Sequence, residues 1–334
     1  MTNLENLPKR VNALQKLPNI AYLILVHRFP EQFKRLFRAI YQPENHYLIH
    51  VDKKADPKTN LIVESFLMDY PNTYVMDREN VGWGGFSMVQ SELNGMLYLL
   101  THNLKWDFFI NLSGQDFPLH SQRSIRGFLG KHPRTNFIKA DNQAQERPET
   151  MNRIDNHFTE THNGFEGFIY RRPYMQGITS YIGGQWMIVT RACCEFLCFS
   201  PEVKKFEDFY LNTLLADESF FQTVLMNTSF EEAIVSDDKR AIIWVSDGEI
   251  KLRPKTFTID DLEFLASSDD LFARKFDEGL DDSILRALEG FLESDFSSIS
   301  SAAAAQPLPT RTFKISKTGG LTTRTLLATP FDDG

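Results

Sequence analysis

The sequence predicts an α/β fold in which a mostly parallel central sheet is covered by helices on both faces. Short apolar runs, which are typical of buried strands, alternate along the first half of the chain with segments whose apolar residues recur at helical spacing. Strands that alternate with helices in this way form parallel sheets. Polar side chains follow several of the predicted strands, at the edge of the sheet where α/β proteins bind ligands.

The predicted elements of the first half follow one another in a regular order. Strands are expected at 21–26 (AYLILV), 47–51 (YLIHV) and 108–112 (FFINL), with a weaker strand at 73–76. Helices are expected at 30–40 and 86–104. His27, Asp52 and Asp116 come after predicted strands, so we expect them at the carboxyl edge of the sheet.

The second half is less regular. Residues 142–161 are polar and are expected to be mostly loop. Strands are expected at 187–189 and 242–245, and helices at 191–199, 201–215, 217–227, 260–265 and 283–292. Asp217 has the position of an N-cap for the third of these helices. We expect a polar lead-in at 1–19, a single domain at 20–296 and a flexible, low-complexity tail at 297–334.

Composition indicates a soluble globular protein. Charged residues make up 24% of the 334, and the net charge of −8 argues against a general nucleic-acid binder. No apolar run approaches the ~20 residues of a spanning helix, and the N-terminal residues lack the apolar region of a secretory signal. We therefore expect a cytoplasmic protein, with peripheral association at the inner face of the membrane left open.

The cysteines and histidines favour structural roles over metal binding. Cys193, Cys194 and Cys198 crowd into one predicted helix, an odd and clustered set that favours a reducing compartment. Free cysteines commonly pack as small hydrophobes; metal ligation is the alternative, although the spacing fits no zinc pattern. His46 and His50 stand four apart, but in a strand four residues span roughly 13 Å, too far to share one ion.

Glu218 is the first candidate for a chemical role. It lies in the segment ADESFF at 216–221, at the start of a predicted helix, where the helix dipole favours an ionised carboxylate. A base that accepts a proton from a hydroxyl group must be ionised. The alternative is that Asp217 and Glu218 are ordinary carboxylates at the start of a helix.

Arg253, Arg274 and Lys275 form the second candidate set. The segment LFARKFD at 271–277 places two cations inside an apolar frame. Buried cations need partners, and a diphosphate is a suitable one. Ion pairs with the many nearby aspartates are the alternative.

Two Trp–Gly motifs form the third set. Trp83 precedes Gly84 and Gly85, and a similar group, GGQW, occupies 183–186 with Gln185 and Trp186. Glycines allow close backbone approach, and an indole beside them can wall a sugar site or simply pack in the core. Asp-x-Asp, a phosphate-binding P-loop and Gly-x-Gly-x-x-Gly are absent from the sequence.

Together these segments resemble the core-2/I-branching β-1,6-N-acetylglucosaminyltransferase and peptide O-xylosyltransferase family. The resemblance runs from about Ile20 to Leu292 and is closest to the xylosyltransferase branch. Its blocks are LVH at 25–27, FRAIY at 37–41, HVDKKA at 50–55, WGG at 83–85, WDFFINLSGQDFPL at 106–119, GGQW at 183–186, DESFFQTVL at 217–225 and LFARKFD at 271–277.

The resemblance implies a GT-A-type nucleotide-sugar-binding sandwich and an inverting transferase without a catalytic metal or other cofactor. It implies Glu218 as catalytic base, and cations in place of a metal on the diphosphate. The donor would be UDP-xylose or UDP-N-acetylglucosamine, and the acceptor a hydroxyl of a glycan, lipid-linked glycan or protein, giving a β-linkage. The implied donor-site residues are Val26, His27, Asp52, Trp83, Gly84, Asp116, Gln185, Trp186, Arg253, Arg274 and Lys275.

Two alternatives remain open. One is a non-catalytic UDP- or carbohydrate-binding protein that keeps the fold, and the other is a metal-dependent nucleotide-sugar enzyme. Gln185 stands where the xylosyltransferase branch typically has an acidic residue, which leaves the sugar and the acceptor undetermined.

Overall fold

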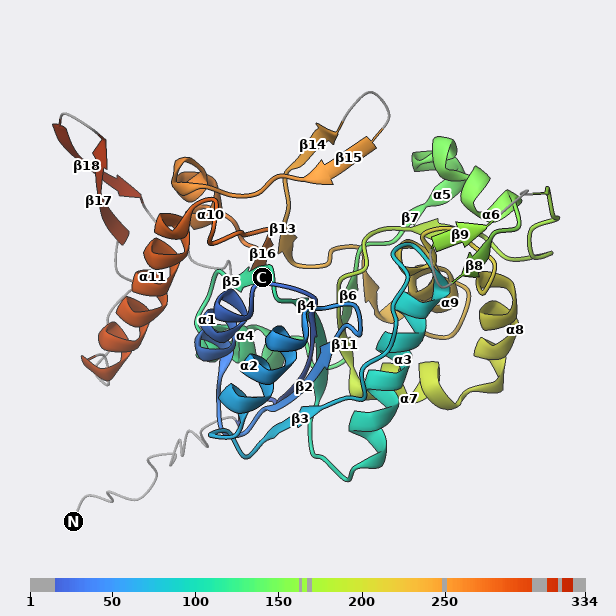
Figure 1. The fold of residues 1–334 in the computed structure, drawn as a ribbon, viewed down its shortest axis with the longest axis horizontal. Helices are drawn as coiled ribbons and strands as arrows, with labels where there is room; N and C mark the ends of the chain where they lie inside the picture. The colour runs from blue at the N-terminus through green and yellow to red at the C-terminus, as the bar shows by residue number, and fades with distance from the viewer. Residues whose placement is uncertain are drawn as a thin grey trace, which may run out of the picture.

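The computed structural model of the protein describes residues 16–161, 164–166, 170–247, 251–301, 311–317 and 320–326. Its centre is a seven-stranded sheet of order β12-β6-β11-β4-β1-β2-β3 (Figure 1). These strands are β1 (Ile20–Val26), β2 (His46–Val51), β3 (Thr73–Val75), β4 (Phe108–Ser113), β6 (Asn136–Ile138), β11 (Met187–Thr190) and β12 (Ile234–Val235). β1 to β4 are mutually parallel, and only β11 runs against its neighbours. The predicted mostly parallel sheet is confirmed.

Helices cover both faces of the sheet, because alternate side chains of its central strands point to opposite sides. Tyr22 and Ile24 of β1 pack into an apolar core with α1, α2, α4 and α11, whereas Ala21 and Leu23 pack into a second core with α3, α7, α8 and α9. The helices are α1 (Pro30–Ile40), α2 (Pro57–Leu67), α3 (Phe86–Thr101), α4 (Gln122–Lys131), α7 (Arg191–Phe199), α8 (Pro201–Tyr210), α9 (Phe220–Met226), α10 (Leu262–Ala266) and α11 (Asp282–Ser301).

A three-stranded sheet of order β13-β16-β5 lies beyond the end of β4. It consists of β5 (Asp116–Pro118), β13 (Arg240–Ala241) and β16 (Phe272–Arg274). The register pairs Arg274 with Asp116, although the two residues are 158 positions apart. Smaller two-stranded pairs are β7 (Asp141–Asn142) with β10 (Tyr181–Ile182), β8 (Thr159–Thr161) with β9 (Gly164–Glu166), and β14 (Trp244–Asp247) with β15 (Lys251–Pro254).

Several expected boundaries were wrong in the second half. Of the strand expected at 242–245, residues 242–243 lie between β13 and β14 and only 244–245 belong to a strand, β14. The segment 142–161 contains the short helices α5 (Gln143–Glu146), η1 (Pro148–Thr150) and α6 (Asn152–Asp155). The remaining short helices are η3 (Glu231–Ala233) and η4 (Ile259–Asp261). Short polar helices carry too weak an apolar period to be recognised from sequence.

The helix expected from Asp217 onward is also different. Ala216–Glu218 forms a separate 3₁₀ turn, η2, and α9 begins only at Phe220. Leu215 has a left-handed backbone with φ of 53°, and Ser219 has φ of −143°, so the chain turns on both sides of η2. Asp217 is therefore not an N-cap of the α-helix.

The C-terminal segment contains more regular structure than expected. α11 continues to Ser301, past the expected boundary at 296, and β17 (Arg311–Lys317) pairs antiparallel with β18 (Gly320–Leu326). The rest of the expected tail (302–310, 318–319 and 327–334) and residues 1–15 of the expected lead-in lie outside the described residues.

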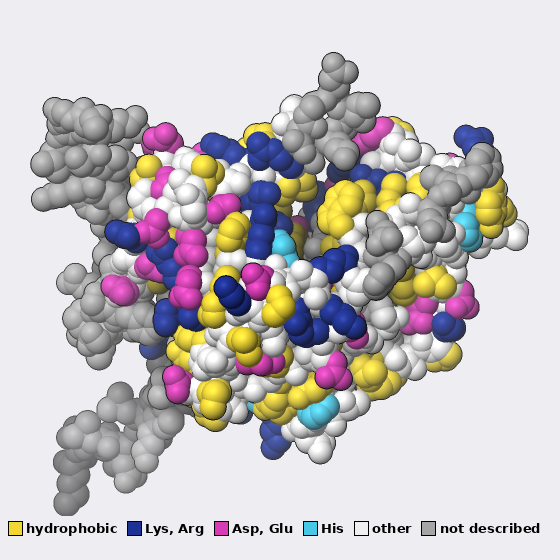
Figure 2. All heavy atoms as spheres, in the orientation of Figure 1, with side chains coloured by type: hydrophobic (Ala, Val, Ile, Leu, Met, Phe, Trp, Pro, Cys, Tyr) yellow, Lys and Arg dark blue, Asp and Glu magenta, His cyan; other side chains and the backbone are white. Residues whose placement is uncertain are grey.

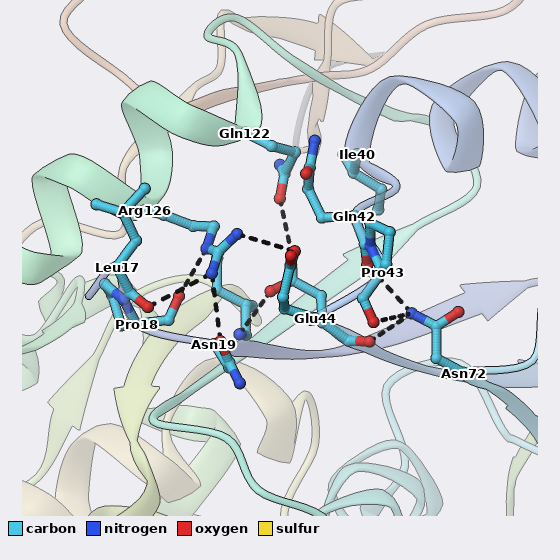
Figure 3. A network of polar contacts seen from close by, with 12 residues as sticks. Leu17, Pro18, Asn19, Ile40, Gln42, Pro43, Glu44, Asn72, Gln122 and Arg126 are labelled. Carbon is cyan, nitrogen blue, oxygen red and sulfur yellow. Dashed lines mark hydrogen bonds and ion pairs between the residues drawn. The ribbon is translucent and has the colours of Figure 1, made fainter. Parts of the chain in front are cut away.

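Polar side chains hold together the edge of the sheet where β1 and β2 begin (Figure 3). Arg126 of α4 donates from Nε to the Pro18 carbonyl (2.8 Å) and from Nη2 to Oδ1 of Asn19 (3.2 Å), and its Nη1 lies 3.3 Å from Oε2 of Glu44. Asn72 donates to the Asn45 carbonyl at 2.6 Å. These contacts connect the entry to β1 with the turn before β2.

The cysteines behave as predicted in the described part of the fold. Cys193 and Cys194 are buried in α7, and all three thiols are free. Burial raises the pKa of Cys198 to about 12. In the part of the chain that the structure describes, no helix combines the length and the apolar composition needed to cross a bilayer.

Candidate active site

A pocket of about 460 Å³ opens at the carboxyl edge of the central sheet. Its walls come from the ends of β1, β2 and β4, from α3 and β16, and from the loops before α3 and β11. Seven predicted site residues line it, namely Val26, His27, Asp52, Trp83, Gln185, Trp186 and Arg274. The sequence analysis missed the other lining residues, which are Leu25, His50, Lys54, Ala55, Val81, Met88, Ser91 and Ser113.

The remaining predicted residues are not part of the pocket lining. The backbones of Gly84 and Glu218 take part in hydrogen bonds that fix the pocket loops, and Asp116 forms an ion pair with Arg274. Lys275 follows Arg274, and Arg253 lies on β15. Figure 2 shows Lys and Arg side chains gathered beside a hollow on the face drawn there.

The ends of β1 and β2 are joined at the pocket. The amide of Asp52 donates to the Val26 carbonyl at 2.9 Å, and Oδ1 of Asp52 accepts from the Lys54 amide at 2.7 Å. Burial lowers the pKa of His27, and the neighbouring Arg28 cation lowers it further. His27 is therefore neutral near pH 7 and available as a hydrogen-bonding group. His50 lies deeper, and its Nε2 accepts from the Glu79 amide at 3.2 Å.

Arg274 is held by contacts on two sides. Its Nη1 lies 2.9 Å from Oδ1 of the fully buried Asp116 and 3.1 Å from Oγ of Ser113, and its guanidinium lies 4.2 Å from the ring centroid of Trp186. The ion-pair alternative is thus realised for Arg274, but with an aspartate from β5 rather than with a neighbour in sequence. The pair orients Arg274 where it still lines the pocket.

Lys275 lies within a group of cations. Its pKa is lowered by burial first, and then by the charges of Arg28, Arg274 and Arg253. Cations that repel one another across a shared space are stabilised when an anion enters it. Arg28, which the sequence analysis missed, is anchored to Oε1 of Gln115 at 3.0 Å.

A second buried arginine, Arg240, was also missed. It is fully buried, its Nη2 donates to the Asn111 carbonyl at 2.5 Å, and its guanidinium lies 5.5 Å from the Trp186 ring centroid. Trp186 therefore contacts two guanidinium groups, Arg240 and Arg274. The sequence around Arg240 does not indicate a site, because the groups that contact Arg240 come from β4 and from the loop before β11.

The Glu218 segment contacts both Trp–Gly loops. The Leu215 amide donates to the Gly84 carbonyl at 2.7 Å, and the Glu218 carbonyl accepts from the Gly183 amide at 2.8 Å. Gly84 has φ of +76°, a backbone conformation that favours glycine. Trp83 is 72% exposed at the pocket, so it is not a core tryptophan. The short η2 turn thereby brings Glu218 next to loops that carry three lining residues.

The Glu218 carboxylate is partly exposed and has a cationic partner. Its side chain is 27% exposed, and Oε2 lies 2.6 Å from Nη1 of Arg153 on α6. Asp217 beside it is buried, and burial together with the Glu218 charge raises the pKa of Asp217 to about 7. The two neighbouring carboxyls thus differ: Glu218 reaches solvent, whereas Asp217 is enclosed. Arg153 lies in a region expected to be loop, which is why it was missed.

Comparison with known proteins identifies the family. The family model described as Branch: Core-2/I-Branching enzyme matches residues 20–266. Xylosyltransferase 2 of Rattus norvegicus is 32% identical over 301 residues, which cover 84% of this chain and 34% of that protein. The Homo sapiens xylosyltransferase 2 is 32% identical and the Ciona intestinalis xylosyltransferase 30% identical, each over 83% of this chain and 34% of the relative.

The chain belongs to the Core-2/I-branching enzyme family, a family of glycosyltransferases, and its fold is an α/β sandwich with a mostly parallel central sheet. It spans about a third of the length of the curated relatives it matches. Among solved structures, S. aureus TarS 1-349 aligns with a TM-score of 0.34 and 14% identity over 65% of this chain and 58% of that one, a similarity too weak to bear on function.

Proposed function

We propose that this protein transfers a sugar from a UDP-sugar to an acceptor hydroxyl, with inversion and without a catalytic metal ion. The observation that carries the proposal is the composition of the pocket. Arg274 lines the pocket, and Lys275 follows it in the chain. The two Trp–Gly loops line the same pocket and are hydrogen-bonded to Leu215 and Glu218, at the carboxyl edge of the sheet.

Glu218 is the base in this proposal. Its carboxylate takes the proton of the acceptor hydroxyl as the oxygen attacks the anomeric carbon from the face opposite to UDP. One such displacement on an α-linked donor gives a β-linked product. Arg153, 2.6 Å from Oε2, orients the carboxylate, and partial exposure leaves space for an acceptor.

The cations take the charge that develops on the leaving UDP. Arg274 is preorganised by Asp116 and Trp186, so little reorganisation accompanies the reaction. Lys275, Arg253 and Arg28 add positive charge nearby. The names of the relatives favour UDP-xylose as donor, with UDP-N-acetylglucosamine second. The acceptor is a hydroxyl of a glycan, lipid-linked glycan or protein.

The first experiment measures UDP release from a panel of UDP-sugars, with and without EDTA, by the wild type and by Glu218→Gln. We expect release from one donor, unchanged by EDTA, and roughly 10²- to 10⁴-fold slower in the variant, because a general base contributes about that much. UDP affinity should persist in the variant. Glu231→Gln, an exposed carboxylate change on η3, is the control.

Other results would redirect the proposal. Loss of release on EDTA treatment would indicate a metal-dependent enzyme, and wild-type turnover by Glu218→Gln would remove the base assignment. Clear UDP binding without release, with or without a panel of glycan acceptors, would favour a binding protein that keeps the fold.

A further inference from the structure

A buried carboxyl group, Glu92 of α3, lies directly behind the pocket and has no role in the mechanism above. Its side chain is fully buried, while Met88 and Ser91 of the same helix line the pocket. Oε1 of Glu92 accepts from Nδ2 of Asn111 at 2.8 Å and from Nε2 of Gln185 at 3.0 Å. Oε2 has no hydrogen-bond partner among the residues that the structure describes.

The orientation of Asn111 follows from a backbone donor. The Met187 amide can only donate, and it lies 2.8 Å from Oδ1 of Asn111. Nδ2 of Asn111 must then face the other way, toward Oε1 of Glu92 and the Gln185 carbonyl at 2.9 Å. Because Nδ2 only donates, Oε1 of Glu92 is required to be an acceptor.

The orientation of Gln185 follows in turn. An accepting oxygen at Glu92 requires a donor from Gln185, so Nε2 of Gln185 faces Glu92. Oε1 of Gln185 is then the opposite end of an amide whose residue lines the pocket. The Gln185 carbonyl is also held by Asn111, so backbone and side chain are both fixed.

We propose that Glu92 and Asn111 hold Gln185 so that its Oε1 is a hydrogen-bond acceptor in the pocket, which selects a donor sugar that presents an O–H or N–H group there. This inference rests on the proposed function and adds a specificity-determining residue, Gln185, and a positioning residue, Glu92. A hydroxyl of xylose or the N–H of an acetamido group meets the requirement.

The protonation of Glu92 is consistent with this arrangement. Burial raises the pKa of Glu92 to about 8, with a further rise from the Asp217 charge, against the lowering by Asn111 and Gln185. Oε1 already accepts two hydrogen bonds, so the proton resides on Oε2. A glutamine at position 92 reproduces this neutral form, with a carbonyl oxygen in place of Oε1.

The test compares the affinities for UDP-xylose, UDP-N-acetylglucosamine and UDP by calorimetry, in the wild type, Gln185→Met, Glu92→Met and Glu92→Gln. We expect the preference for the better UDP-sugar over UDP to fall roughly 3- to 10-fold in Gln185→Met and Glu92→Met, the effect of one lost hydrogen bond. Glu92→Gln and the exposed control Gln90→Ala, on the same helix, should stay within about twofold of wild type.

A double-variant cycle separates positioning from general damage. If Glu92 acts through Gln185, Glu92→Met combined with Gln185→Met should lose no more preference than Gln185→Met alone. Should Glu92→Met not fold, Gln185→Met, at the pocket surface, still decides the question. Unchanged sugar preference in Gln185→Met, with UDP bound normally, overturns this inference and leaves the proposed function intact. A wild type that binds neither UDP nor any UDP-sugar overturns both.

Discussion

At the scale of single residues, burial divides the titratable groups around the pocket into two kinds. Glu218 and Lys275 are partly exposed, whereas Glu92, Asp116 and Asp217 are enclosed. The partly exposed groups can meet a substrate, because part of their surface is accessible to it. The enclosed groups hold other side chains in place, as Asp116 holds Arg274.

Lys275→Ala should weaken UDP binding roughly tenfold or more, because a charge-assisted hydrogen bond contributes about 1.5–3 kcal/mol. Burial lowers the pKa of Lys275, and the charges of Arg28, Arg274 and Arg253 lower it further, so a bound anion would stabilise the charged form of Lys275. Calorimetric titration with UDP at low and moderate salt measures the effect.

Lys204→Ala on α8 is the control, since Lys204 is 67% exposed in local ion pairs. The same UDP affinity in Lys275→Ala and in the control would remove Lys275 from the diphosphate site.

At the scale of elements, the loops depend on contacts between segments distant in the chain. η2 and the preceding Leu215 hold the two Trp–Gly loops through backbone hydrogen bonds, and β16 brings Arg274 to β5. The opposite edge of the sheet is held by Arg126 of α4, whose guanidinium donates to Pro18 and Asn19 at the entry to β1 (Figure 3).

Arg126→Met should lower the free energy of unfolding by about 1–3 kcal/mol, because the part-buried carbonyls of Leu17 and Pro18 lose their donor. Urea unfolding followed by tryptophan fluorescence measures the change. Arg123→Met is the matched control, since Arg123 is exposed on the same helix. Equal stability of the two variants would show that the network contributes nothing measurable.

At the scale of the whole molecule, two apolar cores on either side of one sheet carry the stability, and the buried carboxyls make it depend on pH. The folded pKa of Glu92, about 8, lies above its ordinary value of 4.5, so the folded protein keeps a proton that the unfolded chain releases. This contribution to stability is complete below pH 4.5 and is lost as the pH rises to about 8.

Glu92→Gln carries no such proton, so its stability relative to the wild type should increase between pH 5.5 and pH 8.5. Each 1 kcal/mol added to the free energy of unfolding raises Tm by about 2–4 °C for a large domain. Thermal unfolding of both proteins at pH 5.5, 7.0 and 8.5 measures it. A Tm difference that stays constant over this range would contradict a titrating Glu92.

Those elements of the fold that could be predicted from the sequence have local signals. The helices at 30–40 and 191–199 have the predicted bounds, since apolar periodicity and a starting proline or threonine cap act within a few residues. The strand ends that carry Val26 and Asp52 were predicted for the same reason. Seven of the predicted site residues line one pocket, and two of them, His27 and Asp52, follow predicted strands.

The partners of these residues could not be predicted, because they come from distant parts of the chain. Nothing near Glu218 in sequence indicates Arg153, and nothing near Gln185 indicates Glu92. The sequence by itself determined the alternation of elements, the polar edge of the sheet and the candidate residues, since these depend on neighbours in the chain. Only the tertiary structure decided which carboxyls are enclosed, which cations gather and how Gln185 is oriented, since these depend on contacts across as many as 161 positions.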